Sequence, residues 1–309
     1  MNRTFKAAVA AFIFAVGFAG SAVAGRSDDA LAAFKKGDYL TVLQLVRPMA
    51  EHGSAVNQFL VGLMYATGEG GVPRDYAAAE SWLRKAADQG HANAQVSLCT
   101  MYFNGGGVPQ NYAAAMDWCR KAADQGDADA QTTLGFMYDE GQSVPMDHVA
   151  AVSWYRKAAD QGNVRAQHNL ARLYFTGLGI PQDYGAAVSL WRKAADQGFA
   201  DAQVNLARMY GTGLGVTQDD ATAVSWIRKA ADQGHTQAQG LLGARYGLGI
   251  GVPQDYVLAH MWFNLAAAGG DKEAVGLRNT IAAQMTPAQI AEAQKLAREW
   301  KLTSTPAPH

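Results

Sequence analysis

The stretch Ala87-Asp88-Gln89-Gly90 decides the fold of this chain, because it returns every 36 residues. Around each copy the same longer pattern recurs: A-Q-x-x-L-[G/A]-x-x-Y, a glycine-rich connector, and then A-x-x-W-x-R-K-A-A-D-Q-G. Six such units fill residues 54–270, so the sequence predicts a repeat protein. The further copies of the tetrapeptide stand at 123–126, 159–162, 195–198 and 231–234, with a degraded copy at 267–270.

Each half of a unit is predicted to form a helix. In the second half, Ala79, Trp82, Leu83 and Ala86 are spaced three, four and seven residues apart, which gives one apolar stripe. The tryptophan, such as Trp154 in the third unit, is expected to be a core residue. In the first half a small residue is expected to let the two helices approach closely. It is Gly62, Gly135, Ala171, Ala207 or Gly243.

The ends of these helices carry matching signals. Arg84-Lys85 and its counterparts occupy the last turn, where cations meet the negative end of a helix. Gly90 and its equivalents suit the left-handed position that ends a helix. The side chains predicted to cap the second helices are Asp75, Asn111, Asp147, Asp183 and Asp255.

The composition excludes two classes of protein. The 309 residues include 26 Lys and Arg against 27 Asp and Glu, for a net charge of -1, and 49% of them are hydrophobic. This balance excludes a disordered, highly charged chain, and it lacks the basic excess that neutralises nucleic-acid phosphates.

The segments outside the repeats are expected to be an export signal, two caps and a tail. Residues 1–24 combine Arg3 and Lys6, an apolar run and the small residues Ala22-Val23-Ala24, which predicts a signal peptide cleaved after Ala24. An uncleaved membrane anchor is the alternative. No later segment has 18 consecutive apolar residues, so we expect a soluble mature protein in the periplasm or secreted. Residues 25–53 are predicted to form a capping helical hairpin, 271–301 capping helices and 302–309 a disordered tail.

The sequence offers little chemistry. It contains no HExxH, GxSxG, SxxK or GxxxxGK[ST] motif, and the glycine-rich connectors lack the lysine of a phosphate-binding loop. The seven histidines are scattered and lack the spacing of a metal site. We therefore expect no catalytic, cofactor-binding or metal-binding residue, and no enzymatic activity.

The repeated pattern resembles the Sel-one-like (Sel1-like) repeat, a relative of the tetratricopeptide repeat with a longer glycine-rich connector. The resemblance covers residues 54–270, with local departures at Thr217, Leu190-Trp191 and Asn264-Leu265. It implies an all-α fold: a right-handed α-α superhelix, or solenoid, of six 36-residue helix-turn-helix repeats with helical caps at both ends. It also implies an adaptor or scaffold function.

One surface is a candidate for binding a partner. If the units stack as tetratricopeptide repeats do, first-helix residues outside the core stripe share a concave face, and Arg172 and Arg208 lie one repeat apart on it. Arginine forks beside amide donors suit a carboxylate or acidic peptide, whereas ordinary solvated helix polarity is the alternative interpretation. The candidate residues are Arg165, His168, Asn169, Arg172, Phe175, Asn205 and Arg208.

We therefore predict an exported, non-enzymatic and monomeric scaffold that binds an unidentified protein or peptide through its concave face and regulates an envelope or signalling complex. The alternative is a cell-wall-related small-molecule binder or β-lactam-hydrolase-like enzyme, because some cysteine-rich relatives are associated with β-lactams. Those relatives carry cysteine pairs throughout their repeats, whereas a single unit has one here.

The two cysteines belong to the second unit. Cys99 stands where other units have a small residue of the first helix, and Cys119 where they have a bulky residue of the second. Helix rise places the two at heights that differ by only about 3 Å, within reach of a disulfide in an oxidising compartment. Two buried free thiols are the alternative.

Overall fold

The computed structural model describes residues 29–304, with side chains described through Trp300. The predicted signal peptide, residues 1–24, and residues 305–309 lie outside the described part. Every regular element between residues 29 and 304 is a helix, as predicted for an α-solenoid. The chain divides between Asp147 and His148 into two compact units.

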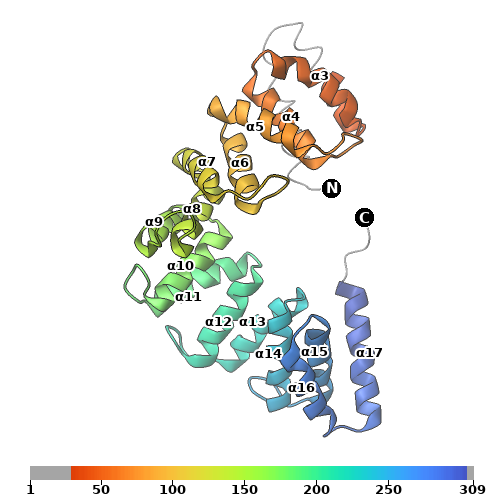
Figure 1. Cartoon of the computed structure of the whole chain (residues 1–309). Coiled ribbons are helices and arrows are strands. Elements are labelled where there is room, and N and C mark those ends of the chain that lie inside the picture. The colour runs from red at the N-terminus through yellow and green to blue at the C-terminus, as the bar shows by residue number, and fades with distance from the viewer. Residues whose placement is uncertain (1–28, 305–309) are drawn as a thin grey trace. The chain divides into compact units, whose positions relative to one another are not determined.

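The first unit contains the N-terminal hairpin and the first repeats. Residues 29–35 are helical, and the helices α3 to α8 follow, each packed against the next along the chain (Figure 1). Their bounds are α3 Tyr39–Glu51, α4 Ala55–Thr67, α5 Tyr76–Asp88, α6 Ala92–Asn104, α7 Tyr112–Asp124 and α8 Ala128–Glu140.

The second unit continues the same alternation and ends in two further helices. Helices α16 and α17 both pack against α15 (Figure 1). Its elements are α9 His148–Asp160, α10 Val164–Thr176, α11 Tyr184–Asp196, α12 Ala200–Thr212, α13 Asp220–Asp232, α14 Thr236–Leu248, α15 Tyr256–Ala268, α16 Lys272–Ala282 and α17 Pro287–Ser304.

The last helix is longer than predicted. The sequence predicts a disordered tail over residues 302–309, but α17 runs to Ser304, so residues 302–304 are helical. The sequence gives no stop signal there, since the next proline is Pro306.

The predicted helix ends are confirmed in most repeats. The side chains of Asp75, Asn111, Asp183 and Asp255 each accept a hydrogen bond from a backbone N–H of the first helical turn. Gly90 adopts φ +86°, and its equivalents at 126, 162, 198 and 234 are also left-handed. These conformations allow the chain to reverse after each second helix.

The most deeply buried position of the second helix is the one after the predicted tryptophan, and the tryptophan position itself is buried in some repeats (Trp118 and Trp262) and only half-buried in others. Trp154 is only half-buried, whereas the following Tyr155 is fully buried. The ammonium group of Lys157 lies 4.1 Å from the centre of the Trp154 ring, so the tryptophan lies at the edge of the core under a lysine. The same buried position holds Leu83, Cys119, Trp191, Ile227 and Phe263.

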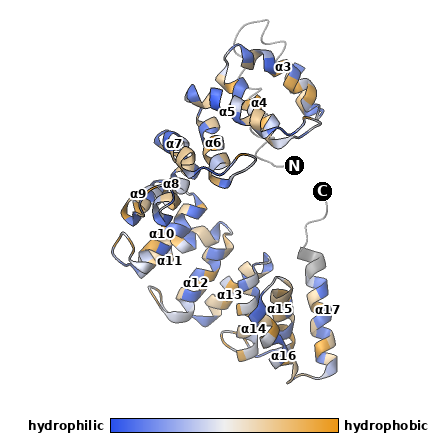
Figure 2. Ribbon diagram, in the orientation of Figure 1, coloured by the Kyte–Doolittle hydropathy of each residue, from blue (hydrophilic) through white to orange (hydrophobic). Residues whose placement is uncertain are grey.

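The small residue of the first helix does permit close packing, as predicted. A Cβ atom on Gly62 would lie 2.8 Å from Cγ of Leu83, and one on Gly243 would lie 2.8 Å from Cδ1 of Phe263. Figure 2 shows hydrophobic and hydrophilic residues on every helix, as expected for helices that each bury one face.

Buried glutamines connect successive hairpins. Gln203 of α12 is 3% exposed, and its Nε2 donates to the carbonyl of Ala195 at the end of α11, at 3.1 Å. Its Oε1 in turn accepts a hydrogen bond of 2.9 Å from Gln233, which follows α13. We call this arrangement the glutamine relay. It recurs with Gln58 and Gln89, Gln95 and Gln125, and Gln167 and Gln197.

The arginine of the repeated pattern has a partner that the sequence did not indicate. Arg156 of α9 donates to the hydroxyl of Tyr174 of α10, at 3.1 Å. Arg192 and Arg228 make the equivalent bonds to Tyr210 and Tyr246. Each bond joins a second helix to the next first helix, so these residues act in packing as well as at a helix end.

Candidate functional site

The predicted partner-binding residues all lie on α10 and α12 of the second unit, and the structure brings the two helices into contact. Arg208 of α12 lies over the ring of Phe175 of α10, with its Cζ atom 4.6 Å from the ring centre. Arg165 and Arg208 are exposed, and Asn169, Arg172 and Asn205 are half-buried. We call these residues together with Phe175 the arginine face.

His168 does not join the polar residues of this face. It packs among aromatic rings, 5.1 Å from Phe199 and 6.5 Å from Trp191, measured between ring centres. Its buried Nδ1 has no hydrogen-bond partner among the described residues, and burial lowers the pKa of the ring. His168 is therefore a neutral packing residue, because a charge on it would be poorly solvated.

Phe175 belongs to the same aromatic group and holds Arg208 in place. Its ring centre lies 5.4 Å from that of Tyr184 and 5.6 Å from that of Trp191. Arg208 therefore stacks on a ring that is itself fixed by packing. Among the described residues, none accepts a hydrogen bond from the guanidinium of Arg208. The group is thus oriented in advance, with its N–H donors open to a ligand.

Two departures from the repeated pattern form an ion pair, and a third leaves space for it. Sequence reasoning missed this pair. Arg245 donates to Asp220 with Nη1 2.6 Å from Oδ1. A Cβ atom on Gly211 would lie 2.9 Å from Nη2 of Arg245, so glycine leaves the space that the guanidinium fills. The equivalent positions hold a buried methionine in place of Arg245 (Met209), a tyrosine in place of Asp220 (Tyr184) and a phenylalanine in place of Gly211 (Phe175).

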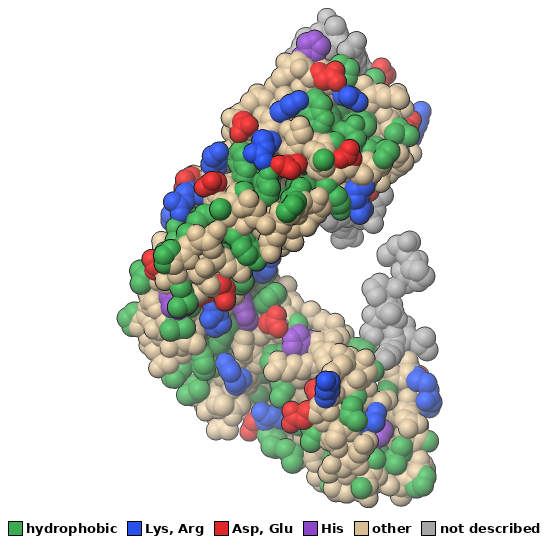
Figure 3. All heavy atoms as spheres, viewed as in Figure 1, with side chains coloured by type: hydrophobic (Ala, Val, Ile, Leu, Met, Phe, Trp, Pro, Cys, Tyr) green, Lys and Arg blue, Asp and Glu red, His purple; other side chains and the backbone are tan. Residues whose placement is uncertain are grey.

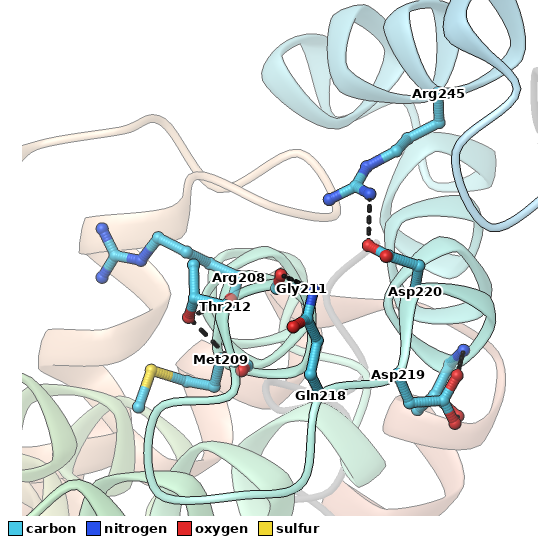
Figure 4. A network of polar contacts seen from close by, with 9 residues as sticks. Arg208, Met209, Gly211, Thr212, Gln218, Asp219, Asp220 and Arg245 are labelled. Atoms are coloured by element: carbon cyan, nitrogen blue, oxygen red, sulfur yellow. Dashed lines mark hydrogen bonds and ion pairs between the residues drawn. The ribbon is translucent and has the colours of Figure 1, made fainter.

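This ion pair is separate from the open arginine. In Figure 4 the guanidinium of Arg208 reaches away from the pair made by Asp220 and Arg245. A hollow of about 230 Å³ lies between α12 and α14, and Asn205, Arg208 and Arg245 are among its lining residues. Arg245 is already paired with the carboxylate of Asp220. Arg208 is therefore the arginine of this hollow that can bind the carboxylate of a ligand. The signal in the sequence is that residues 211, 220 and 245 all differ from the residues at the equivalent positions of the preceding repeat.

A histidine caps α14 at the edge of the arginine face. Nδ1 of His235 accepts a hydrogen bond from the backbone N–H of Ala238, and its Nε2 lies 3.0 Å from Oδ1 of Asp201. His91 caps α6 in the same way, and burial lowers its pKa. Nδ1 can accept only while the imidazole is neutral, so both caps require the unprotonated ring.

The structure joins Cys99 and Cys119 in a disulfide between α6 and α7, with the Cα atoms 4.9 Å apart. The two cysteines occupy the positions that Gly62 and Leu83, or Gly243 and Phe263, hold elsewhere. Other repeats place a small residue of the first helix against a bulky residue of the second. In this repeat two cysteines of intermediate size take both positions, so their sulfur atoms meet at the contact between the two helices.

The charges on the visible surface do not favour one sign. Figure 3 shows basic and acidic side chains interspersed on the face in view.

Over residues 29–304, no group of three or more His, Cys, Asp or Glu side chains is placed to hold a metal ion. None of the helices in the described range combines the length and apolar character needed to cross a membrane.

Comparisons with known proteins agree with this architecture. A Sel1 repeat protein from Oxalobacter formigenes is 30% identical over 77% of this chain and 96% of its own, with a TM-score of 0.68. The protective antigen c5321 of uropathogenic Escherichia coli strains, which has an SLR fold, is 29% identical, with 93% and 72% covered and a TM-score of 0.59. A search of curated proteins gave no significant match.

The match to a family model is direct. The model of the Sel1 repeat matches six consecutive segments: 58–91, 92–127, 128–163, 164–199, 200–235 and 236–271. Sel1 repeat proteins are generally scaffolds for protein–protein interactions. With matched segments that follow one another across more than half of its length, this chain belongs to the Sel1 repeat family.

Proposed function

We propose that this protein is an exported scaffold that binds an acidic segment of another protein through the arginine face. The observation that carries the proposal is Arg208, which is stacked on Phe175 and has no hydrogen-bond acceptor among the described residues. A guanidinium fixed in advance loses less freedom on binding, and its planar fork matches the two oxygens of a carboxylate.

The neighbouring groups support an anionic ligand. Arg165 and Arg172 add positive charge along α10, and Asn169 and Asn205 supply amide groups that can bind a peptide backbone. Asp201, the acidic residue beside them, already binds His235. The face therefore has an excess of cationic donors, although the whole chain has a net charge of only -1.

Export is supported by two features. Residues 1–24 have the composition of a signal peptide, and the disulfide between Cys99 and Cys119 is of a kind that persists in oxidising compartments. A bacterial periplasm fits both. Amino-terminal sequencing of the protein recovered from a periplasmic extract should begin at Gly25, and recovery of a chain that still begins at Met1 would contradict this part of the proposal.

The binding proposal can be tested with three synthetic decapeptides that alternate serine with glutamate, lysine or glutamine. Fluorescence anisotropy should show binding of the glutamate peptide, with weaker binding as salt increases, because the contacts are between opposite charges. The double change Arg172→Glu and Arg208→Glu should weaken this binding at least tenfold while far-UV circular dichroism is unchanged.

A control variant separates local recognition from net charge. Lys295→Glu with Arg298→Glu makes the same charge change on α17, where both side chains are exposed. It should alter the affinity less than twofold. If both double variants lose binding equally, or if neither does, the arginine face is not the binding site.

A further inference from the structure

A second groove lies in the first unit, between α4 and α6. It has a volume of about 680 Å³, and both helices that form its walls pack against α5 (Figure 1). The volume is within the range of ligand-binding pockets, about 300–1,000 Å³. No charged side chain is among the described residues that line it. This distinguishes the α4–α6 groove from the arginine face.

One wall of the groove is a row of neutral polar side chains on α6. Asn93, Ser97, Thr100 and Asn104 are spaced four, three and four residues apart, so they follow one face of the helix. At a rise of about 1.5 Å per residue the row extends over about 16 Å, with polar groups about 4.5–6 Å apart. Ser97 is half-buried, and the other three side chains are exposed.

The opposite wall is apolar. Phe59, Leu63 and Ala66 of α4 are spaced four and three residues apart and are all half-buried. Phe59 stacks on His91, with the ring centres 4.7 Å apart, so the wall is fixed at one end by the cap of α6. A ligand in the groove would therefore meet hydrogen-bonding groups on one side and apolar groups on the other.

The repeat register shows how this groove differs from the arginine face. The positions equivalent to Asn93, Ser97, Thr100 and Asn104, two repeats later, are held in α10 by Arg165, Asn169, Arg172 and Thr176. Two of these four positions are thus neutral in α6 and cationic in α10. A charged ligand that pairs with the arginines of α10 would not suit the neutral row of α6. Its charge would lose hydration there without gaining a counter-charge, which costs free energy.

We propose that the α4–α6 groove binds an uncharged, extended segment of a partner protein, about five residues long. An extended chain rises about 3.3 Å per residue, so five residues match the 16 Å row. Its backbone groups on one side recur about every 6.6 Å, close to the spacing of the polar groups on α6. Side chains of an extended chain project about perpendicular to these backbone groups, so alternate ones point toward Tyr76 and Leu83 of α5, which also line the groove between its two walls. A helical ligand satisfies its own backbone and would leave the polar row unused.

The probes are three nonapeptides with an uncharged dye, an acetylated amino end and an amidated carboxyl end. One alternates valine with serine, and in the other two glutamate or lysine replaces valine. Anisotropy titrations of the full mature protein should show binding of the valine peptide, and binding of the charged peptides should be at least tenfold weaker.

Variants of the polar row identify the site. Asn93→Ala with Asn104→Ala should weaken binding of the valine peptide about tenfold, the effect of losing two hydrogen bonds of ordinary strength. Thr100→Trp, at an exposed position that lines the groove, should abolish it. Gln44→Ala, on the exposed surface of α3, should leave it unchanged.

The outcome is independent of the proposed function. Arg172→Glu with Arg208→Glu should not change binding of the valine peptide, whatever it does to acidic peptides. The inference is overturned if the valine peptide does not bind at millimolar protein, if a charged peptide binds as well, or if the α6 variants bind it like wild type.

Discussion

Replacing Gln203 with leucine tests whether the glutamine relay stabilises the array. The change removes the hydrogen bond to the carbonyl of Ala195 and the one accepted from Gln233, at 3.1 and 2.9 Å. Each such bond contributes about 1 kcal/mol net. The carbonyl of Ala195 keeps the hydrogen bond from the backbone N–H of Gly198, at 3.0 Å, so it is not left without a donor. The leucine regains part of this by burying apolar surface. The expected loss in the free energy of unfolding is therefore about 1–2 kcal/mol.

Urea denaturation followed by far-UV circular dichroism measures this loss. Gln237→Leu is the matched control, since Gln237 is exposed on α14 and should change stability by less than about 0.5 kcal/mol. A double-mutant cycle between Gln203→Leu and Gln233→Leu should give a coupling of about 1 kcal/mol. Equal losses in Gln203→Leu and the control, or a coupling of zero, would refute the reasoning.

Four other results are expected. Tyr155→Ala should destabilise the protein by about 3–5 kcal/mol in urea, and Trp154→Ala by clearly less, because Tyr155 is the buried one of the two; the reverse order would contradict the core assignment. Burial lowers the pKa of His91 from 6.5, so the unfolded state binds its proton first and stability should fall as pH drops through about 6.5. In His91→Asn, urea midpoints at pH 7.5 and 5.5 should differ less than in wild type. Reducing the disulfide of Cys99 and Cys119 should lower stability by about 3 kcal/mol, as for a closed loop of about 20 residues, and unreduced denatured protein should contain no titratable thiol. Purified protein should not hydrolyse nitrocefin; turnover that co-purifies with the chain through two columns would support the enzymatic alternative.

The sequence predicted the helices well because their signals are local. Asp75 and Gly90 mark helix ends through bonds and backbone angles that involve only the nearest few residues. The apolar spacing likewise located the core stripe. It did not rank Trp154 against Tyr155, since both fall within one helical stripe and only the neighbouring helix decides which side chain is enclosed.

The features that the sequence did not predict depend on contacts between elements. Gln203 is polar and would ordinarily be placed on the surface, and its buried position follows from a carbonyl on the preceding helix. The pair of Asp220 and Arg245 needs the space above Gly211, which no single repeat reveals. For the candidate site, the sequence placed Arg208 on the correct helix, but its stacking on Phe175 and the packing role of His168 required the structure.

The glutamine relay also bears on how such a chain changes length. Each of the relay glutamines Gln58, Gln95, Gln167 and Gln203 accepts from a glutamine of its own repeat and donates to a backbone carbonyl of the preceding helix. A backbone carbonyl is present whatever residue occupies that position. The sequence of a duplicated repeat therefore contains the groups for both hydrogen bonds, the one that it makes within itself and the one that it donates to the preceding repeat. Gain or loss of a whole 36-residue block leaves every remaining bond with a partner, whereas gain or loss of part of one does not. Selection on this family can thus lengthen or shorten the array between its ends without redesigning any junction.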